Sequence, residues 1–243
     1  MKMLTLANRN MKEIVRDPLT LGFGLGFPLV LLLLLSAIQA SIPVSLFEIE
    51  SLTPGITVFG LSFMTLFSAT LLAKDRGSAL LQRIYTTPLS AADFILGYTL
   101  PILPITVAQC IVCYIVALPL GLGLSLNILL AILFIIPVAV LFIALGLLFG
   151  SILNDKQVGG ICGALLTNLS AWLSGTWFDL KLVGGVFEKI ANLLPFLHAV
   201  EMERAVLTGD LSGIFPHLWW VAGYAALALI AAILLFLRQM KRQ

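Results

Sequence analysis

KDRGSALLQRIYTTPLS, residues 74–90, lies between two long apolar runs and decides how the rest of the chain is arranged. The segment carries three of the fourteen basic residues of the chain. Four large apolar residues recur in it at the spacing of one helix face: Leu80, Leu81, Ile84 and Tyr85. Pro88 disfavours helical dihedrals at the preceding residue, so a helix is expected to end there. The pattern predicts an amphipathic helix that docks on a membrane or a protein; an ordinary charged loop is the alternative.

The composition indicates an integral membrane protein. Of 243 residues, 60% are hydrophobic and 11% are charged, whereas a soluble domain carries about 25% charged residues. Each membrane helix needs about 20 residues, so six spans and their connections use the whole length. The first apolar run is too long for a signal-peptide core and is expected to be retained as a span. No basic patch for nucleic acid is visible.

Six apolar runs are expected to cross the bilayer as helices, which makes the fold class all-α. The expected spans cover residues 19–40, 53–73, 94–120, 126–153, 158–173 and 218–237. Pro101 and Pro104 predict a kink in the third span. In the fifth span Gly163, Thr167 and Ser170 belong to a face of small residues, which another helix can approach closely.

Two segments outside the spans have a distinct character. Residues 2–17 are basic and amphipathic, which predicts a helix in the membrane interface that ends at Asp17-Pro18. Residues 174–217 contain Gly, Pro and charges between short apolar runs. These runs are too interrupted to span, so they predict short re-entrant or interfacial helices.

Candidate metal or redox sites are weak. Cys110-x-x-Cys113 and Cys162 all lie inside apolar runs and are interpreted as small core residues. Four potential metal ligands occur in the segment before the last span: His198, Glu201, Glu203 and His217. A solvated helix face is the preferred interpretation for them, and no metal site is predicted.

The distribution of Lys and Arg predicts the orientation. Eleven of the fourteen lie in the N-terminal segment, in residues 74–83, at Lys156 and at the C-terminus. Only Lys181, Lys189 and Arg204 fall on the other side. Because cytoplasmic loops carry the excess of positive charge, both termini and residues 74–90 are expected in the cytoplasm of a multi-pass protein of the cell (inner or plasma) membrane. Residues 174–217 are then external.

Missing features narrow the function. The six expected spans contain no Asp, Glu, Lys or Arg, which are common in ion-coupled carriers and pumps. No positioned nucleophile and base for hydrolysis is visible, so the chain is not expected to be an enzyme. No G-x-x-x-x-G-K-[ST] motif occurs either. Energy for any active transport would therefore have to come from a separate subunit.

Three groups of residues, in the right order, resemble the membrane subunit of a type-two ABC exporter, the ABC-2 transporter permease family. Residues 9–18, RNMKEIVRDP, are similar to its N-terminal connecting helix. Asp75-Arg76-Gly77 with Arg83 and residues 87–90 are similar to its cytoplasmic coupling helix, although the family often has Glu in place of Asp75. Residues 173–178 and 192–196, followed by Arg204 and Gly209, resemble its external re-entrant helices, although Asp179 stands where the family commonly has Pro or a small residue.

The resemblance implies one transmembrane domain over residues 1–243 with three kinds of site. It implies an ATPase-coupling helix over residues 75–88 that contains Asp75, Arg76, Gly77, Leu80, Leu81, Arg83, Ile84, Tyr85 and Pro88. It implies a substrate pathway or dimer face on spans two and five, with Phe59, Ser62, Phe63, Thr65, Gly163, Thr167, Ser170 and Ser174. In the external segment 174–217 it implies roles for Gly175, Phe178, Pro195 and Arg204.

It also implies partners. Two permease chains, expected as a homodimer in the lipid bilayer, would stand above two ABC ATPase subunits. ATP and Mg would bind to those ATPases, and this chain would bind no cofactor. The apolar spans favour efflux of a hydrophobic or amphipathic small molecule, such as a drug or antibiotic. Export of a polysaccharide or lipid-linked glycan is the alternative, and a non-transporting immunity or assembly subunit is the alternative of another class.

Overall fold

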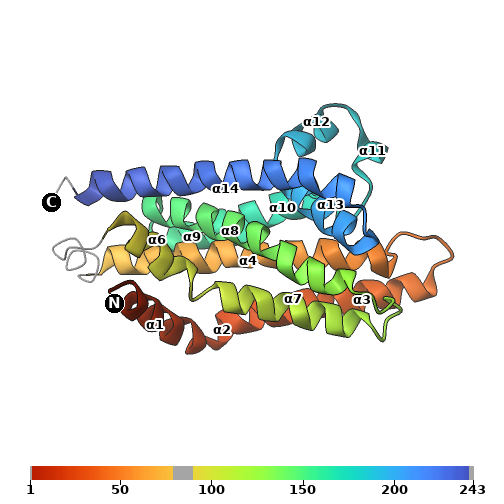
Figure 1. The fold of residues 1–243 in the computed structure, drawn as a ribbon, viewed down its shortest axis with the longest axis horizontal. Helices are drawn as coiled ribbons and strands as arrows, with labels where there is room; N and C mark the ends of the chain where they lie inside the picture. Colours follow the sequence, from red (N-terminus) through yellow and green to blue (C-terminus); the bar gives the residue numbers. More distant parts are fainter. Residues whose placement is uncertain (1, 79–89, 241–243) are drawn as a thin grey trace.

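The structure is a computed structural model that describes residues 2–78 and 90–240, and every regular element in these ranges is a helix. The long helices lie side by side along one axis (Figure 1). The start of α1 and the end of α14 share one end of the bundle with the end of α4 and the start of α6, whereas α11 and α12 project near the other (Figure 1). This confirms the all-helical fold.

The N-terminal segment begins with the amphipathic helix α1 (Lys2–Val15). A break at Asp17 follows, as the Asp-Pro pair predicted, and then come α2 (Pro18–Leu21), the π-helix η1 (Gly22–Gly26) and α3 (Phe27–Ser41). Only 17% of the most apolar window of the stretch Gly22–Ser41 is buried in the chain. This first span therefore lies at the periphery of the bundle.

Helix α4 (Ile49–Gly77) forms the centre of the bundle. It packs against α3, α7, α8, α10 and α13, and 89% of its most apolar window is buried. Its small polar residues bond to backbone rather than to each other: the Thr65 hydroxyl donates to the Phe142 carbonyl at 2.7 Å, and Ser68 donates to Met64 at 2.7 Å. A buried hydroxyl thus keeps a partner without holding the helices apart.

Helix α8 (Asn127–Ile152) makes the most extensive contact with α4. A side chain at Gly146 would place its Cβ 2.5 Å from the Thr65 carbonyl oxygen, and one at Gly150 would lie 2.7 Å from the Ala69 carbonyl oxygen. Since both neighbours are backbone atoms, they cannot move aside. The Gly146-x-x-x-Gly150 spacing is therefore used for direct backbone contact.

The third expected span is two helices, α6 (Ala91–Thr99) and α7 (Leu103–Ala117). The break between them falls at residues 100–102, beside Pro101 and Pro104, which confirms the predicted kink. A reciprocal cap begins α6, because Ser90 accepts from the Asp93 amide and Asp93 accepts from the Ser90 amide.

The fifth expected span is composite. It consists of α9 (Asp155–Val158), the π-helix η2 (Gly159–Leu166) and α10 (Thr167–Leu173). Within the described ranges, five helical stretches are long and apolar enough to cross a membrane: Gly22–Ser41, Ile49–Gly77, Ala91–Ala117, Asn127–Ile152 and Leu211–Gln239. The run 155–173 is not among them because Asp155, Lys156 and Asn168 reduce its apolar character. The fifth expected span therefore remains a prediction, whereas the other five are found.

Short helices occupy the segment after it, as its interrupted sequence predicted. They are α11 (Leu180–Val183), α12 (Gly185–Leu193) and α13 (Pro195–Thr208). The last helix, α14 (Leu211–Met240), begins earlier than the expected start at residue 218. Asp210 explains this difference, because its carboxylate accepts from the amides of Ser212 and Gly213, both at 3.1 Å, and so caps the helix start.

The close contact between α4 and α8 yields a first prediction. Gly146→Ala should lower the melting temperature of the purified protein, because the new methyl group clashes with α4 and overpacking costs roughly 1–3 kcal/mol. The matched control is Gly223→Ala on α14, where a Cβ would meet open space. Equal melting temperatures for the two variants would contradict the contact.

Candidate functional site

One end of the bundle is organised by Asp75, and it is called the Asp75 end below. Asp75 is 2% exposed and accepts two hydrogen bonds at the same oxygen, Oδ2. Arg9 of α1 donates from Nη1 at 2.6 Å, and the Tyr98 hydroxyl of α6 donates at 2.7 Å. Asn10, fully buried, donates to the Gly97 carbonyl at 3.0 Å. These bonds join α1, α4 and α6.

Arg9 carries the positive charge of this junction. Its second nitrogen, Nη2, pairs with Glu13 at 2.6 Å. Partial burial lowers the pKa of Arg9, but the hydrogen bond and charge of Asp75, with the charge of Glu13, outweigh it and raise that pKa above its usual value. Arg9 therefore stays cationic throughout the physiological range, and the junction with Asp75 does not depend on pH through this group.

Arg76, the next residue of α4, holds the end of α8. Its guanidinium donates to the carbonyls of Ser151, Ile152 and Leu153, the last at 2.6 Å. Carbonyls in the last turn of a helix have no partner within it, so Arg76 supplies the missing donors. Gln239 of α14 also donates to the Ser151 carbonyl, at 3.0 Å. The Asp75 end thus links α4 to α8 and α14 as well.

The predicted coupling segment begins at this end of the bundle, at the end of α4. Asp75, Arg76 and Gly77 form the last turn of α4 rather than the start of a separate helix. Six other predicted coupling residues lie outside the described residues: Leu80, Leu81, Arg83, Ile84, Tyr85 and Pro88. The chain returns at α6, which is joined to Asp75 through Tyr98. The helices before and after the predicted segment, α4 and α6, are therefore joined at one buried carboxylate.

The predicted pathway residues of α4 are buried within the chain. Phe59 and Phe63 are each 7% exposed, and their rings pack edge to face at 5.8 Å. The Phe59 ring also meets Trp177 at 5.6 Å. Ser62 and Thr65 are fully buried, and the Ser62 hydroxyl donates to the Phe59 carbonyl at 2.7 Å. These side chains pack inside this single chain.

The small residues of the fifth expected span also face inward. A Cβ at Gly163 would lie 3.3 Å from Leu66 of α4. Thr167, Ser170 and Ser174 are buried, and their hydroxyls donate to nearby carbonyls of their own segment. The helix that approaches this face is therefore α4 of the same chain. Their assignment to a pathway or dimer face remains a prediction.

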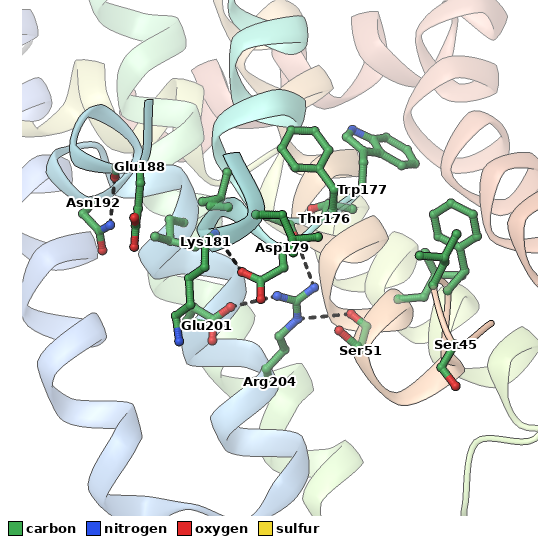
Figure 2. A pocket seen from close by; sticks show the side chains of 18 of the residues that line it. Ser45, Ser51, Thr176, Trp177, Asp179, Lys181, Glu188, Asn192, Glu201 and Arg204 are labelled. Atoms are coloured by element: carbon green, nitrogen blue, oxygen red, sulfur yellow. Dashed lines mark hydrogen bonds and ion pairs between the residues drawn. The ribbon is translucent and has the colours of Figure 1, made fainter. Parts of the chain in front are cut away.

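The other end of the bundle contains a cavity of about 590 Å³, called the Arg204 cavity (Figure 2). Arg204 donates to the Ser51 carbonyl at 3.3 Å and to the Gly175 carbonyl at 3.0 Å, and it pairs with Glu201 at 2.8 Å. It thereby ties α13 to the start of α4 and to the turn after α10. Gly175 has φ of +70°, a left-handed conformation that suits glycine.

Both polar and apolar side chains line the Arg204 cavity. Its lining includes the rings of Trp177 and Phe178 and the charged Asp179 and Lys181. Figure 2 shows Asp179 close to Arg204. The Phe178 ring is held between those of Trp172 and Phe187, at 6.1 and 6.2 Å. Pro195, predicted to act in the same segment, is the first residue of α13 and is buried. The volume suits a drug-sized molecule with both apolar and charged parts.

The interpretation of His198, Glu201, Glu203 and His217 as a solvated face is wrong for two of them. Glu203 is fully buried and His198 is 7% exposed. His198 Nε2 lies 2.9 Å from the Asn192 carbonyl, which only accepts, so in a neutral His198 ring Nδ1 is the acceptor and His217 Nδ1 donates to it at 2.8 Å. Among the described residues, no group of three or more His, Cys, Asp or Glu side chains could hold a metal.

Sequence reasoning missed three residues that organise the site. Arg9 was placed in the basic N-terminal helix without a partner, Tyr98 was not singled out, and Glu203 was placed in solvent. Arg9 and Asp75 are 66 positions apart, and Tyr98 follows Asp75 by 23. Local spacing carries no signal for such pairs, although a lone tyrosine at the end of an apolar run is a weak indication of a polar partner.

The helices and their membrane-length apolar stretches define a multi-pass membrane protein. Residues 1–208 match the family model for the ABC-2 type transporter, so the chain belongs to the ABC-2 type transporter family. Members of this family are membrane components of ABC transporters and are not themselves catalytic. The earlier resemblance is thereby confirmed. A comparison with curated proteins finds no match.

The Asp75 end yields a second prediction. Asp75→Asn removes the charge that pairs with Arg9, so α1 should loosen and its amides should exchange with solvent about tenfold faster. Only a moderate effect is expected, because the Arg9 side chain is 39% exposed and water screens it. Asp155→Asn, at an exposed residue of α9, is the control. Unchanged exchange in α1 would disprove the role of Asp75.

Proposed function

We propose that this chain is the permease subunit of an ATP-driven ABC exporter that moves a hydrophobic or amphipathic small molecule out of the cell. The observation that carries the proposal is the Asp75 end, where one buried carboxylate joins α1, α4 and α6. The predicted docking segment begins and ends at these elements. Membership of the ABC-2 type transporter family supports the same function.

A separate ATPase supplies the energy in this proposal. Two ATPase subunits bind ATP and Mg and dock on the coupling segments of two permease chains, expected to be identical. An ATPase shifts the permease only through a contact whose energy differs between two states. Force applied to the segment would reach α4 through Asp75 and α8 through Arg76.

The nature of the substrate is inferred from the Arg204 cavity and the spans. The cavity offers the rings of Trp177 and Phe178 with charges close by, which fits a molecule with an apolar body and a polar group. It lies at the end of the bundle opposite Asp75, and so on the external side in the proposed orientation. The cavity would then bind the substrate late in export.

The proposed orientation gives a third prediction. In a variant without Cys110, Cys113 and Cys162, all buried in the native chain, single cysteines are placed at the exposed positions Ser51, Ser212 and Ser78. Ser51→Cys and Ser212→Cys should react with an impermeant thiol reagent added to intact cells, whereas Ser78→Cys should react only after the membrane is opened. Labelling of Ser78→Cys from outside would invert the topology.

Energy coupling gives a fourth prediction. Leu81→Asp combined with Ile84→Asp should abolish export and co-purification of the ATPase while the permease still reaches the membrane, because the apolar docking face is lost. Arg83→Glu alone should have a weaker effect, since an exposed ion pair contributes about 0–1 kcal/mol. The measurements are co-purification and substrate-stimulated ATP hydrolysis in proteoliposomes.

The matched control carries two equally polar changes at the opposite end. Leu124→Asp with Leu126→Asp replaces side chains that are 87% and 80% exposed in the connection between α7 and α8. This variant should keep the ATPase. If the Leu81 and Ile84 double variant hydrolyses ATP and exports as the native protein does, the coupling assignment is wrong.

A further inference from the structure

Glu203 on α13 is a carboxyl group in the interior of the bundle. It is 0% exposed, and neither oxygen has a hydrogen-bond partner among the described residues. The Tyr114 hydroxyl of α7 faces the carboxyl without completing a hydrogen bond to it. Tyr114 is 1% exposed, and its hydroxyl is also unpaired. Two polar groups are thus buried together with their bonding capacity unused.

Among the residues that the structure describes, no cation forms an ion pair with Glu203. The neighbouring Arg204 directs its guanidinium to Ser51, Gly175 and Glu201 instead. Helix α13 packs against α4, α8, α10, α12 and α14, and α8 and α10 contain no ionisable residue. The ionisable residues on the remaining neighbours and on α13 itself lie at helix ends, on exposed faces or in other bonds: Glu50, Lys74, Asp75, Arg76, Glu188, Lys189, His198, Glu201, His217, Tyr224 and Arg238.

From α7, only groups that are neutral when protonated face Glu203. They are Tyr114, with Cys110 close enough to feel the charge of the carboxylate. Cys113 lies beside Cys110 and Tyr114 and accepts weakly from Gln109 at 3.7 Å. These side chains of α7 can accept a hydrogen bond from Glu203 but carry no positive charge.

An ionised carboxylate in such a place is unfavourable, because burial removes its hydration and nothing replaces it. A protonated carboxyl group is a hydrogen-bond donor as well as an acceptor. Its O–H can donate to an unpaired oxygen such as that of Tyr114. We propose that Glu203 is a proton-binding site, protonated while α13 is seated in the bundle and ionised, with release of the proton to water, when α13 moves out.

Helix α13 is placed so that this proton matters beyond Glu203. Arg204, the next residue, and Glu201, two positions before, line the Arg204 cavity. Arg204 holds α13 to the start of α4 and pairs with Glu201. A displacement of α13 that brings Glu203 to water would also break these contacts. Packing of α13 against the bundle, which closes this wall of the cavity, and binding of one proton by Glu203 therefore occur together. Neither the ATPase nor the substrate takes part in this binding of a proton.

The sign of the pH dependence follows from the burial. Desolvation raises the pKa of Glu203 well above its usual value, and the neighbouring Tyr114 offsets this only in part. The folded chain then binds more protons than the unfolded chain between the ordinary carboxyl pKa, about 4.3, and the raised pKa. Stability is greatest below this window, falls as the pH rises through it, and levels off above it.

Infrared spectroscopy of the purified full-length permease in lipid nanodiscs tests the protonation directly. At neutral pH the native protein should show the C=O stretching band of a protonated carboxylic acid, and Glu203→Gln should lose it. Glu201→Gln is the matched control, because Glu201 lies two positions away with its side chain 38% exposed and paired with Arg204. It should keep the band. A spectrum without such a band, or one unchanged in Glu203→Gln, would overturn the proposal.

Melting temperature measured between pH 5 and pH 9 tests the coupling. As the pH rises, the melting temperature of the native protein and of Glu201→Gln should fall by about 3 °C or more for each unit by which the pKa of Glu203 is raised within this range. The melting temperature of Glu203→Gln should remain nearly constant. If Glu203→Gln does not fold, Tyr114→Phe replaces it and should shift the frequency of the carboxyl band. A parallel pH dependence in native protein and Glu203→Gln, or stabilisation of the native protein by Na⁺ at constant pH, would refute the proton site.

Discussion

The close approach of α4 to α8 determines where the other helices can lie. Inside a membrane the lipid tails are as apolar as the side chains, so helices associate through packing and hydrogen bonds. Gly146 and Gly150 bring the two backbones together, and Thr65 uses the remaining space to bond across the interface. With this pair fixed, α3 and α7 cover one part of α4, and α13 and α10 cover others. The bundle is built outward from one pair of helices.

Because α4 spans the whole bundle, its two ends are mechanically related. At one end Asp75 and Arg76 bind neighbouring helices, and at the other the Ser51 carbonyl accepts from Arg204. A tilt of this helix would change both sets of contacts at once. For a transporter this arrangement has a simple use: work done on one side of the membrane alters the shape of a cavity on the other without any flexible connection between them.

Much of the fold could be predicted from local patterns. Low charge indicated the membrane, Asp17-Pro18 ended the first helix, and Pro101 divided the third span. The start of α14 was misplaced because Asp210 caps it several residues before its apolar run. Glu203 was misjudged for another reason. Charge predicts exposure only on average, and which face of α13 is buried depends on helices far away in the sequence, as does the pairing of Arg9 with Asp75.

The π-helix η2 has a consequence for the segment that follows it. A π-helix accommodates an extra residue within its turns and is uncommon because its packing is poorer than that of an α-helix. If η2 rewound by one residue into α-helical geometry, α10 would turn about its axis by roughly 100°, the angle between successive residues of an α-helix. Thr167 and Ser170 would then face a different direction around the axis of α10. Such a change in η2 would therefore turn α10 without a break in the helix.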